Sequence, residues 1–141
     1  MTRPRGERGS VTLEAVILIP AFLLFVALVI AGGRVAMARQ GVQTAAAEAA
    51  RQASIARTAG EATAKAQAGA QQTLADQQLP CRSSSVVTDT SGFAAPVGTP
   101  ASVSATVTCE VDLAGVAIPG LPGSLTITVT FQSPLDTFRG R

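Results

Sequence analysis

One long apolar stretch dominates the first quarter of the chain. Residues 15–33 (AVILIPAFLLFVALVIAGG) run for 19 residues without a charged side chain. A helix of this length extends about 28 Å, close to the roughly 30 Å hydrocarbon core of a bilayer. The stretch is apolar on every face, whereas a surface helix of a soluble protein keeps a polar side. We therefore predict a transmembrane helix over residues 10–34, the alternative being a buried helix of a soluble protein.

The following segment is rich in helix-forming residues. Residues 35–79 contain no Pro and are dominated by Ala, Gln, Arg and Glu, which favour a helix. We expect a helix over residues 35–80 that Pro80 ends, and within it Glu61 and Lys65 have the spacing of an i,i+4 ion pair. Large apolar residues are sparse, so the Ala face either packs closely against a partner or belongs to a solvated spacer. Three glycines mark positions where such a helix could bend or break: Gly41, Gly60 and Gly69.

Beyond residue 80 the pattern changes from helical to alternating. Residues 103–113 alternate apolar and polar side chains with a period of two, and residues 125–131 repeat the pattern. Such alternation predicts two half-buried antiparallel strands, and a weaker third strand is expected over Ser83–Thr88. The Pro- and Gly-rich segment LAGVAIPGLPG between the two clear strands predicts a loop. The expected inner face consists of Val103, Ala105, Val107, Cys109, Val111, Leu113, Leu125, Ile127, Val129 and Phe131.

These elements predict an α+β fold. An N-terminal transmembrane helix continues into a long Ala-rich helix, and a small antiparallel β-sheet packs on its outer end, because three short strands cannot bury their inner face alone. We divide the chain into a basic cytoplasmic leader at residues 1–9, a transmembrane helix at 10–34, an extracytoplasmic helix at 35–80 and a small extracytoplasmic β domain at 81–141.

The placement of charge predicts the orientation of the span. Arg3, Arg5 and Arg8 precede the apolar stretch, whereas Arg34 and Arg39 follow it. Cytoplasmic flanks are enriched in Lys and Arg, so this modest bias favours a cytoplasmic N-terminus. We expect a single-pass protein of the cell membrane, with the lipid bilayer as a partner and the C-terminal region outside the cell. No run of five basic residues occurs, so no nucleic-acid partner is expected.

The composition lacks the residue patterns that are typical of enzymes. The chain has no His, which removes the commonest general base and metal ligand, and neither of its two Cys belongs to a C-x-x-C pair. No Gly-rich phosphate loop occurs either. We therefore expect no enzymatic activity, no cofactor, no metal site and no small-molecule substrate.

The two cysteines have a structural interpretation instead. Cys81 follows Pro80 at the predicted helix end, and Cys109 lies on the inner face of the clearest strand. An even number of cysteines outside the membrane favours a disulfide over two free thiols. A bond between them would staple the sheet to the helix end and stabilise the domain by about 3–4 kcal/mol on the loop-entropy estimate.

Glu14 is the one charged residue inside the apolar stretch that begins at Val11. Intramembrane carboxylates are costly and usually have a partner. The plain interpretation places Glu14 in the headgroup region, where it starts the helix. Its neighbours Gly-Ser-Val-Thr-Leu-Glu, residues 9–14, suggest more, because they follow a short basic leader. This pattern resembles the type IV prepilin signal, which a prepilin peptidase cuts after the Gly on the cytoplasmic side.

The match extends along the whole apolar stretch. Pro20 follows Glu14 by six positions, and Gly33-Arg34 closes the stretch before the Ala-rich segment. This pattern is similar to the TadE-like family of the tight-adherence pilus system, and the ending SPLDT at residues 133–137 resembles its actinobacterial members. Two departures are Ser10, where prepilins usually carry a bulky apolar residue, and the pair Ala31-Gly32, where many members have an acid.

The resemblance implies a membrane-anchored minor pilin or pseudopilin of a tight-adherence type IV pilus assembly or secretion system. Its partners would be a prepilin peptidase, other pilin-like subunits and pilus assembly proteins. Cleavage between Gly9 and Ser10 would create a cationic amine that neutralises the Glu14 carboxylate of an adjacent subunit and sets the axial stagger. Pro20 would either soften the helix for exit from the bilayer or be a tolerated kink. Arg34 would complete the set of assembly residues.

A second class of function remains open. Ala36-Met37-Ala38 has the small-x-small form of a signal-peptidase site. The alternative is therefore a secreted or cell-surface structural protein with a cleaved signal peptide and no enzymatic activity. The mature N-terminus distinguishes the possibilities: Ser10 for prepilin processing, Arg39 for secretion, and Met1 or Thr2 for an uncleaved anchor.

Overall fold

The computed structural model describes residues 8–113 and 123–138, with side chains from Glu14 onward. Most of the predicted leader and most of the predicted 113–123 loop lie outside these ranges, so both stay predictions. The elements in chain order are α1 (Arg8–Ser54), α2 (Ala59–Asp76), β1 (Cys81–Asp89), the short 3-10 helix η1 (Ser91–Ala94), β2 (Ser102–Asp112) and β3 (Ser124–Pro134). A long apolar helix followed by a small sheet confirms the predicted α+β class.

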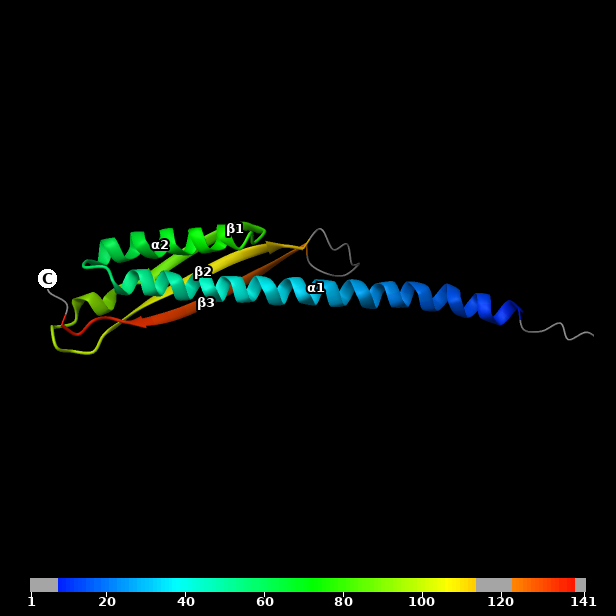
Figure 1. The fold of residues 1–141 in the computed structure, drawn as a ribbon, viewed down its shortest axis with the longest axis horizontal. Helices are drawn as coiled ribbons and strands as arrows, with labels where there is room; N and C mark the ends of the chain where they lie inside the picture. Colours follow the sequence, from blue (N-terminus) through cyan, green and yellow to red (C-terminus); the bar gives the residue numbers. More distant parts are fainter. Residues whose placement is uncertain (1–7, 114–122, 139–141) are drawn as a thin grey trace, which may run out of the picture.

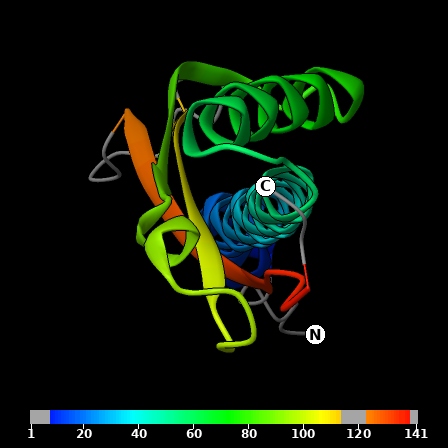
Figure 2. The same ribbon diagram turned by 90° about the vertical axis from the view of Figure 1, so that its left-hand side faces the viewer.

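The three strands, α2 and the C-terminal half of α1 form one folded region, here called the outer layer, in which the helices pack on the sheet (Figures 1 and 2). The strands form an antiparallel sheet in the order β1-β2-β3. The C-terminal half of α1 packs against β2 and β3, and α2 packs against α1 and β1. The N-terminal half of α1 extends beyond the sheet (Figure 1). The molecule is thus one long helix, α1, with the small α+β outer layer at its C-terminal half.

The Ala-rich segment folds as two antiparallel helices rather than as one long helix. α1 ends at Ser54 and α2 begins at Ala59. The break lies just before Gly60, whereas Gly41 and Gly69 are inside helices. The continuous 35–80 helix is therefore corrected to a helical hairpin.

A capping box explains the break. The side chain of Thr58 accepts a hydrogen bond from the backbone N–H of Glu61 at 3.2 Å, and the Glu61 carboxylate accepts one from the N–H of Arg57 at 3.0 Å. The first contact satisfies one N–H group that a helix start leaves unpaired, and the second fixes the residue before the N-cap. The predicted ion pair between Lys65 and Glu61 is present at 2.9 Å. Hydrogen bonds from Lys65 and then from Arg57 hold the pKa of Glu61 below its usual value.

The Ala side chains form the interface between the hairpin and the sheet. Those of α2 recur every four residues and therefore occupy one face of the helix. Close packing through the Ala face is thus the correct alternative, with the partner supplied by the same chain, and the segment is not a solvated spacer. The buried positions of the two helices are Ala38, Val42, Ala45, Ala46, Ala49, Ala50 and Ala53 in α1, and Ala62, Ala66, Ala70 and Leu74 in α2.

Gly41 provides the space where the end of α2 meets α1. A Cβ at this position would lie 2.5 Å from Leu79 Cδ1 and 2.7 Å from Gln77 Oε1. Gly41→Val should therefore lower the free energy of unfolding by about 1–3 kcal/mol, the usual cost of overpacking. Gly60→Ala is the control, because no atom lies within 4 Å of a Cβ there. Thermal denaturation of both variants in detergent measures the difference, and equal melting temperatures for Gly41→Val and the wild type would contradict this packing.

The alternating pattern located the strands to within a few residues. β1 is longer than the predicted Ser83–Thr88, and β3 extends past residue 131 to Pro134. All six predicted inner residues of the second strand region, from Val103 to Leu113, are at most 5% exposed. In β3, Ile127 is buried but Phe131 is 48% exposed, because β3 is an edge strand that pairs only with β2.

Candidate functional site

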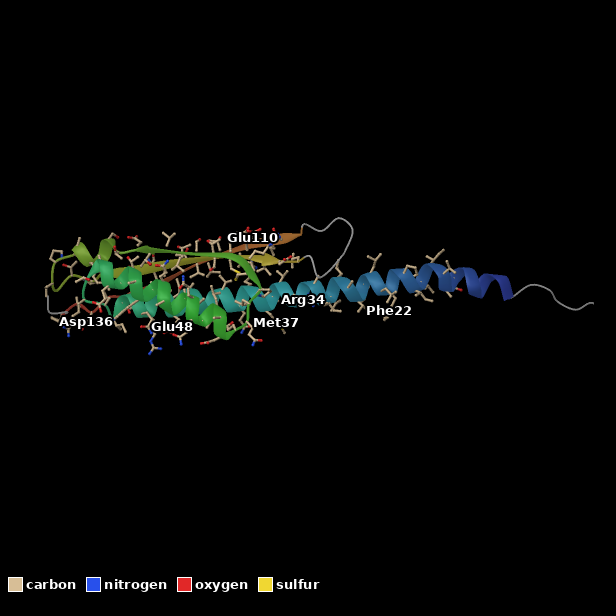
Figure 3. All side chains as sticks on the ribbon, turned by 90° about the horizontal axis from the view of Figure 1, so that it is seen from above. Phe22, Arg34, Met37, Glu48, Glu110 and Asp136 are labelled. Carbon is tan, nitrogen blue, oxygen red and sulfur yellow. A yellow bond between two sulfur atoms is a disulfide. The ribbon has the colours of Figure 1, made fainter. Side chains whose placement is uncertain are left out.

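The apolar half of α1 is mostly uncovered by protein, with Ala31 as its one buried residue among those with described side chains. The part of the helix from Glu14 onward contains a window with a mean hydropathy of 2.9, of which 6% is buried, and it is long and apolar enough to cross a membrane. Except for the half-buried Val26, its large apolar side chains between Val16 and Ile30 are 50–66% exposed. Figure 3 shows them projecting on all sides around the labelled Phe22. Exposed apolar surface of this extent is typical of a site that contacts lipid or another protein.

The predicted processing and assembly residues lie along this helix. Gly9 and Ser10 belong to its first turns, but their side chains are outside the described set. Glu14 and Arg34 are exposed, and α1 continues through Pro20. At 1.5 Å per residue, Glu14 and Arg34 are about 30 Å apart. The fold therefore keeps Glu14 and Arg34 apart within one chain, whereas Ser10 and Glu14 are four residues apart on the same helix.

The outer layer begins where the apolar stretch ends. Val35 packs against the hydrophobic core, and Ala38 belongs to that core with 2% exposure. No spacer therefore separates the apolar half of α1 from the folded outer part.

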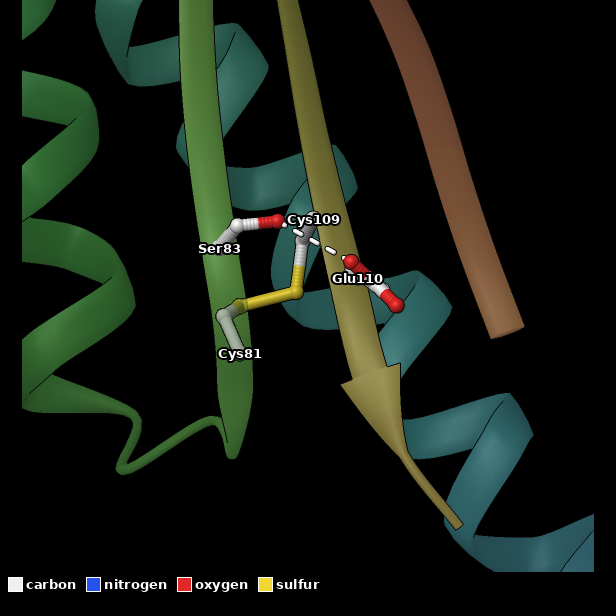
Figure 4. Close-up of a disulfide and its surroundings, with 4 residues drawn as sticks. All are labelled: Cys81, Ser83, Cys109 and Glu110. Carbon is white, nitrogen blue, oxygen red and sulfur yellow. Dashed lines mark hydrogen bonds between the residues drawn. A yellow bond between two sulfur atoms is a disulfide. The ribbon is translucent and has the colours of Figure 1, made fainter. Parts of the chain in front are cut away.

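The predicted disulfide is present. Cys81 and Cys109 are bonded, with their Cα atoms 5.5 Å apart. Figure 4 shows the bond between β1 and β2, beside a hydrogen bond of 3.2 Å that Ser83 Oγ donates to Glu110 Oε2. Cys81 comes directly after the Leu79-Pro80 segment that closes against Gly41. The predicted pairing is confirmed, but the expected staple between the sheet and the helix end is corrected: Cys81 is the first residue of β1, so the bond joins two neighbouring strands of the sheet. It occupies both thiols of the chain.

Polar side chains line the seam between α1 and α2 in the outer layer. Over residues 8–113 and 123–138, no group of three His, Cys, Asp or Glu side chains is placed to hold a metal ion. An open groove follows the seam between α1 and α2, and polar side chains such as Glu48, Gln52 and Lys65 line it. Gln52 Nε2 donates to Glu48 Oε1 at 2.7 Å, and Lys65 is paired with Glu61. These groups are engaged in contacts within their own helices.

Sequence reasoning missed two features of this molecule. The break at residues 55–58 was signalled by the Thr58-x-x-Glu61 pattern, which the strong helix propensity of the surrounding Ala residues obscured. The open edge of β3 had no signal beyond the absence of charge from Ser124 to Pro134, which an inner strand could share. Sequence alone does not reveal which strand is at an edge.

The comparisons with known proteins concern α1. Residues 9–51 match the family model described as TadE-like protein. The match begins at the Gly of the predicted processing site and ends in the last turn of α1. It confirms, for this segment of the chain, the resemblance inferred from the motif. No curated protein and no solved structure matches the chain.

Proposed function

From the TadE-like segment at residues 9–51, we propose that this protein is a membrane-anchored minor pilin or pseudopilin of a tight-adherence pilus assembly or secretion system. The observation that carries the proposal is the coincidence of two features. The segment that matches the family includes the whole apolar half of α1, and that half is exposed on all sides. A soluble protein would leave this surface in water at a large cost in free energy.

The proposed orientation places the N-terminus in the cytoplasm and the sheet outside the cell. The leader with Arg3, Arg5 and Arg8 favours this orientation. A disulfide between Cys81 and Cys109 agrees with it, because such bonds persist in oxidising compartments. A prepilin peptidase would then meet Gly9 at the cytoplasmic face of the membrane.

The proposed role of Glu14 is to set the position of neighbouring subunits. Cleavage after Gly9 gives Ser10 a cationic amine, which pairs with the Glu14 carboxylate of the adjacent subunit. Two opposite charges in a low-dielectric bundle attract strongly only in one register, because other registers leave a charge unpaired. The exposed Glu14 side chain is free to make such a contact within the bilayer.

The continuous helix α1 connects the apolar half of the subunit rigidly to its outer layer. The helix runs without a break from Arg8 to Ser54, about 70 Å, and its second half is fixed in the core. A pull on the outer layer is therefore transmitted directly to the membrane half. Pro20 leaves the carbonyl of Val16 without its helical donor, which softens α1 near the middle of the bilayer.

The secreted alternative conflicts with the packing of α1. Cleavage after Ala38 would cut the helix where it enters the core, since Ala38 is 2% exposed and Val42 is fully buried. It would also remove Val35, which packs against the core. A mature protein that begins at Arg39 would lose part of the surface that holds the sheet, and this supports an anchor that stays attached.

Labelling of a single added thiol tests the proposed topology. Both native cysteines are bonded, so a Cys at the exposed position Gln71 supplies the only free thiol. We expect a membrane-impermeant maleimide to label Gln71→Cys in intact cells, whereas Thr2→Cys in the leader should be labelled only in lysed cells and only in the uncleaved precursor. Labelling of Gln71→Cys only after lysis would reverse the orientation, and recovery of the labelled protein in the medium would favour the secreted alternative.

A further inference from the structure

The two edges of the sheet differ in their protection. The β1 edge carries the charged residues Arg82 and Asp89, has a register shift between Cys81 and Ser83, and lies next to α2. The Ser91 N–H donates to the Asp89 carboxylate at 2.9 Å and holds its pKa below the usual value, so Asp89 is charged at neutral pH. Charges, irregular register and covering helices are the usual protections of an edge strand.

The β3 edge has almost none of these protections. From Ser124 to Ser133 the strand contains no charged residue and no Pro. Its pairing with β2 is regular from Ser124 to Pro134, without a register shift. Strand β3 is therefore regularly paired, uncharged and rich in β-branched residues. An edge strand with these properties can accept another strand.

Both faces of β3 carry side chains that a further strand could contact. On its outer face Thr130 and Thr128 form hydroxyl hydrogen bonds to Thr106 and Thr108 of β2, at 2.8 and 3.2 Å. On the opposite face Phe131 is about half exposed. An added strand would continue the rows of hydroxyl groups and would cover the exposed side of Phe131. The backbone groups of β3 that face away from β2 would supply the hydrogen bonds.

We infer that the free edge of β3 is a docking site for a β-strand of another polypeptide, which adds antiparallel to β3 as a fourth strand. Alternate side chains of a strand point to opposite faces. The strand that fits is uncharged, with apolar residues on the face covered by α1 and small hydroxyl residues on the other. Antiparallel addition pairs apolar with apolar and hydroxyl with hydroxyl positions across the new contact.

A second copy of this chain is a poor occupant in one membrane. Residues 126–130 (TITVT) are symmetric about Thr128, so antiparallel self-pairing would match the side chains well. However, β3 runs along α1 (Figure 1), and the two-fold axis of that pairing would point the two apolar halves of α1 in opposite directions. Parallel self-pairing would place the apolar face of one sheet beside the Thr face of the other. The exclusion of a second copy rests on the membrane anchoring proposed above.

The same symmetry provides a probe. A peptide with the sequence of residues 124–132 (SLTITVTFQ), made soluble by a charged tail, should pair antiparallel with β3 in the full-length protein in lipid nanodiscs. In that register Thr128 of the protein lies opposite Thr128 of the peptide. Fluorescence anisotropy of the labelled peptide measures binding, and hydrogen exchange of the β3 amides locates it. We expect binding with slowed exchange in β3, and no binding of a scrambled peptide.

Charge substitutions at the pairing position test the register. Thr128→Lys in the protein should weaken binding of a peptide that also carries Lys there by roughly tenfold or more, because like charges lie directly opposite. Thr128→Glu in the protein should restore binding of the Lys peptide. Ser85→Lys is the matched control: Ser85 pairs with Thr108, which pairs with Thr128, so it lies in the same row at the other edge, and the substitution should leave binding unchanged.

Each outcome decides for or against the inference. Absence of binding, binding without protection of β3, or equal effects of Ser85→Lys and Thr128→Lys would overturn it. Self-association of the full chain that Thr128→Lys abolishes, measured by sedimentation in detergent, would assign the edge to a second copy and overturn the choice of occupant. Flotation of the nanodiscs measures membrane anchoring independently of peptide binding. Loss of anchoring would contradict the proposed function, whereas loss of peptide binding alone would contradict only the docking site.

Discussion

A Glu14→Gln variant should reach the membrane in normal amount and fail to support pilus assembly. The substitution keeps the size of the side chain and removes only its charge. Insertion should be no worse, because an unpaired carboxylate in apolar surroundings is unfavourable. Assembly should suffer, because breaking a buried pair by removing one partner costs about 3–5 kcal/mol, which lowers an association constant by more than about a hundredfold.

The measurement compares membrane abundance with surface pili in cells that carry only the variant. Glu48→Gln is the matched control, since Glu48 is an acidic residue of the same helix that contacts Gln52 outside the apolar half. It should leave both quantities unchanged. Normal pilus assembly by Glu14→Gln would remove the pairing mechanism and favour Glu14 as a helix start in the headgroup region.

A Cys109→Ser variant should lose a large part of the stability of the outer layer. The disulfide closes a loop with a sequence separation of 28 residues, and its removal should lower the free energy of unfolding by about 3–4 kcal/mol on the loop-entropy estimate. The new hydroxyl occupies a fully buried position, which adds a cost. The apolar half of α1 does not belong to the hydrophobic core that contains Cys109, so membrane insertion should be unaffected.

Limited proteolysis and thermal denaturation measure this loss, and two controls separate the causes. Cys81→Ser removes the same bond at a partly exposed position, so it should destabilise somewhat less than Cys109→Ser. A reductant should destabilise the wild type and leave either variant unchanged. Equal protease resistance of the wild type with and without reductant would show that the bond contributes little.

The sequence predicted the features whose signal is local and periodic. The span follows from a charge-free run as long as the hydrocarbon core is thick. The strands follow from period-two alternation, which is strongest in β2 because that central strand buries one whole face. The disulfide followed from the position of Cys109 on this inner face and of Cys81 just after Pro80. Each of these signals depends on short-range pattern and on general physical limits.

Other features depend on competition between signals or on tertiary position. At residues 55–58 the propensity of Ala favours a continuous helix, while the Thr58–Glu61 capping box favours a new start, and the packing of two Ala faces decides between them. Gly41 looked like a weak point of a helix, yet its role is to admit Leu79. Phe131 shares the alternation of its strand, but its exposure depends on the strand order. The proposed contact between the Ser10 amine and the Glu14 carboxylate joins two subunits, so a single chain cannot display it.

The mature N-terminus of the native protein tests the central claim most directly. A prepilin peptidase needs close access to the backbone at Gly9, where a Cβ would collide, so Gly9→Val should leave the full precursor. Mass spectrometry of the protein purified from the membrane fraction of its host reads the outcome. The proposed function predicts a chain that begins at Ser10 in the wild type and an uncut leader in Gly9→Val. A wild-type chain that begins at Arg39, or one that keeps its leader whether or not Gly9 is changed, would contradict it.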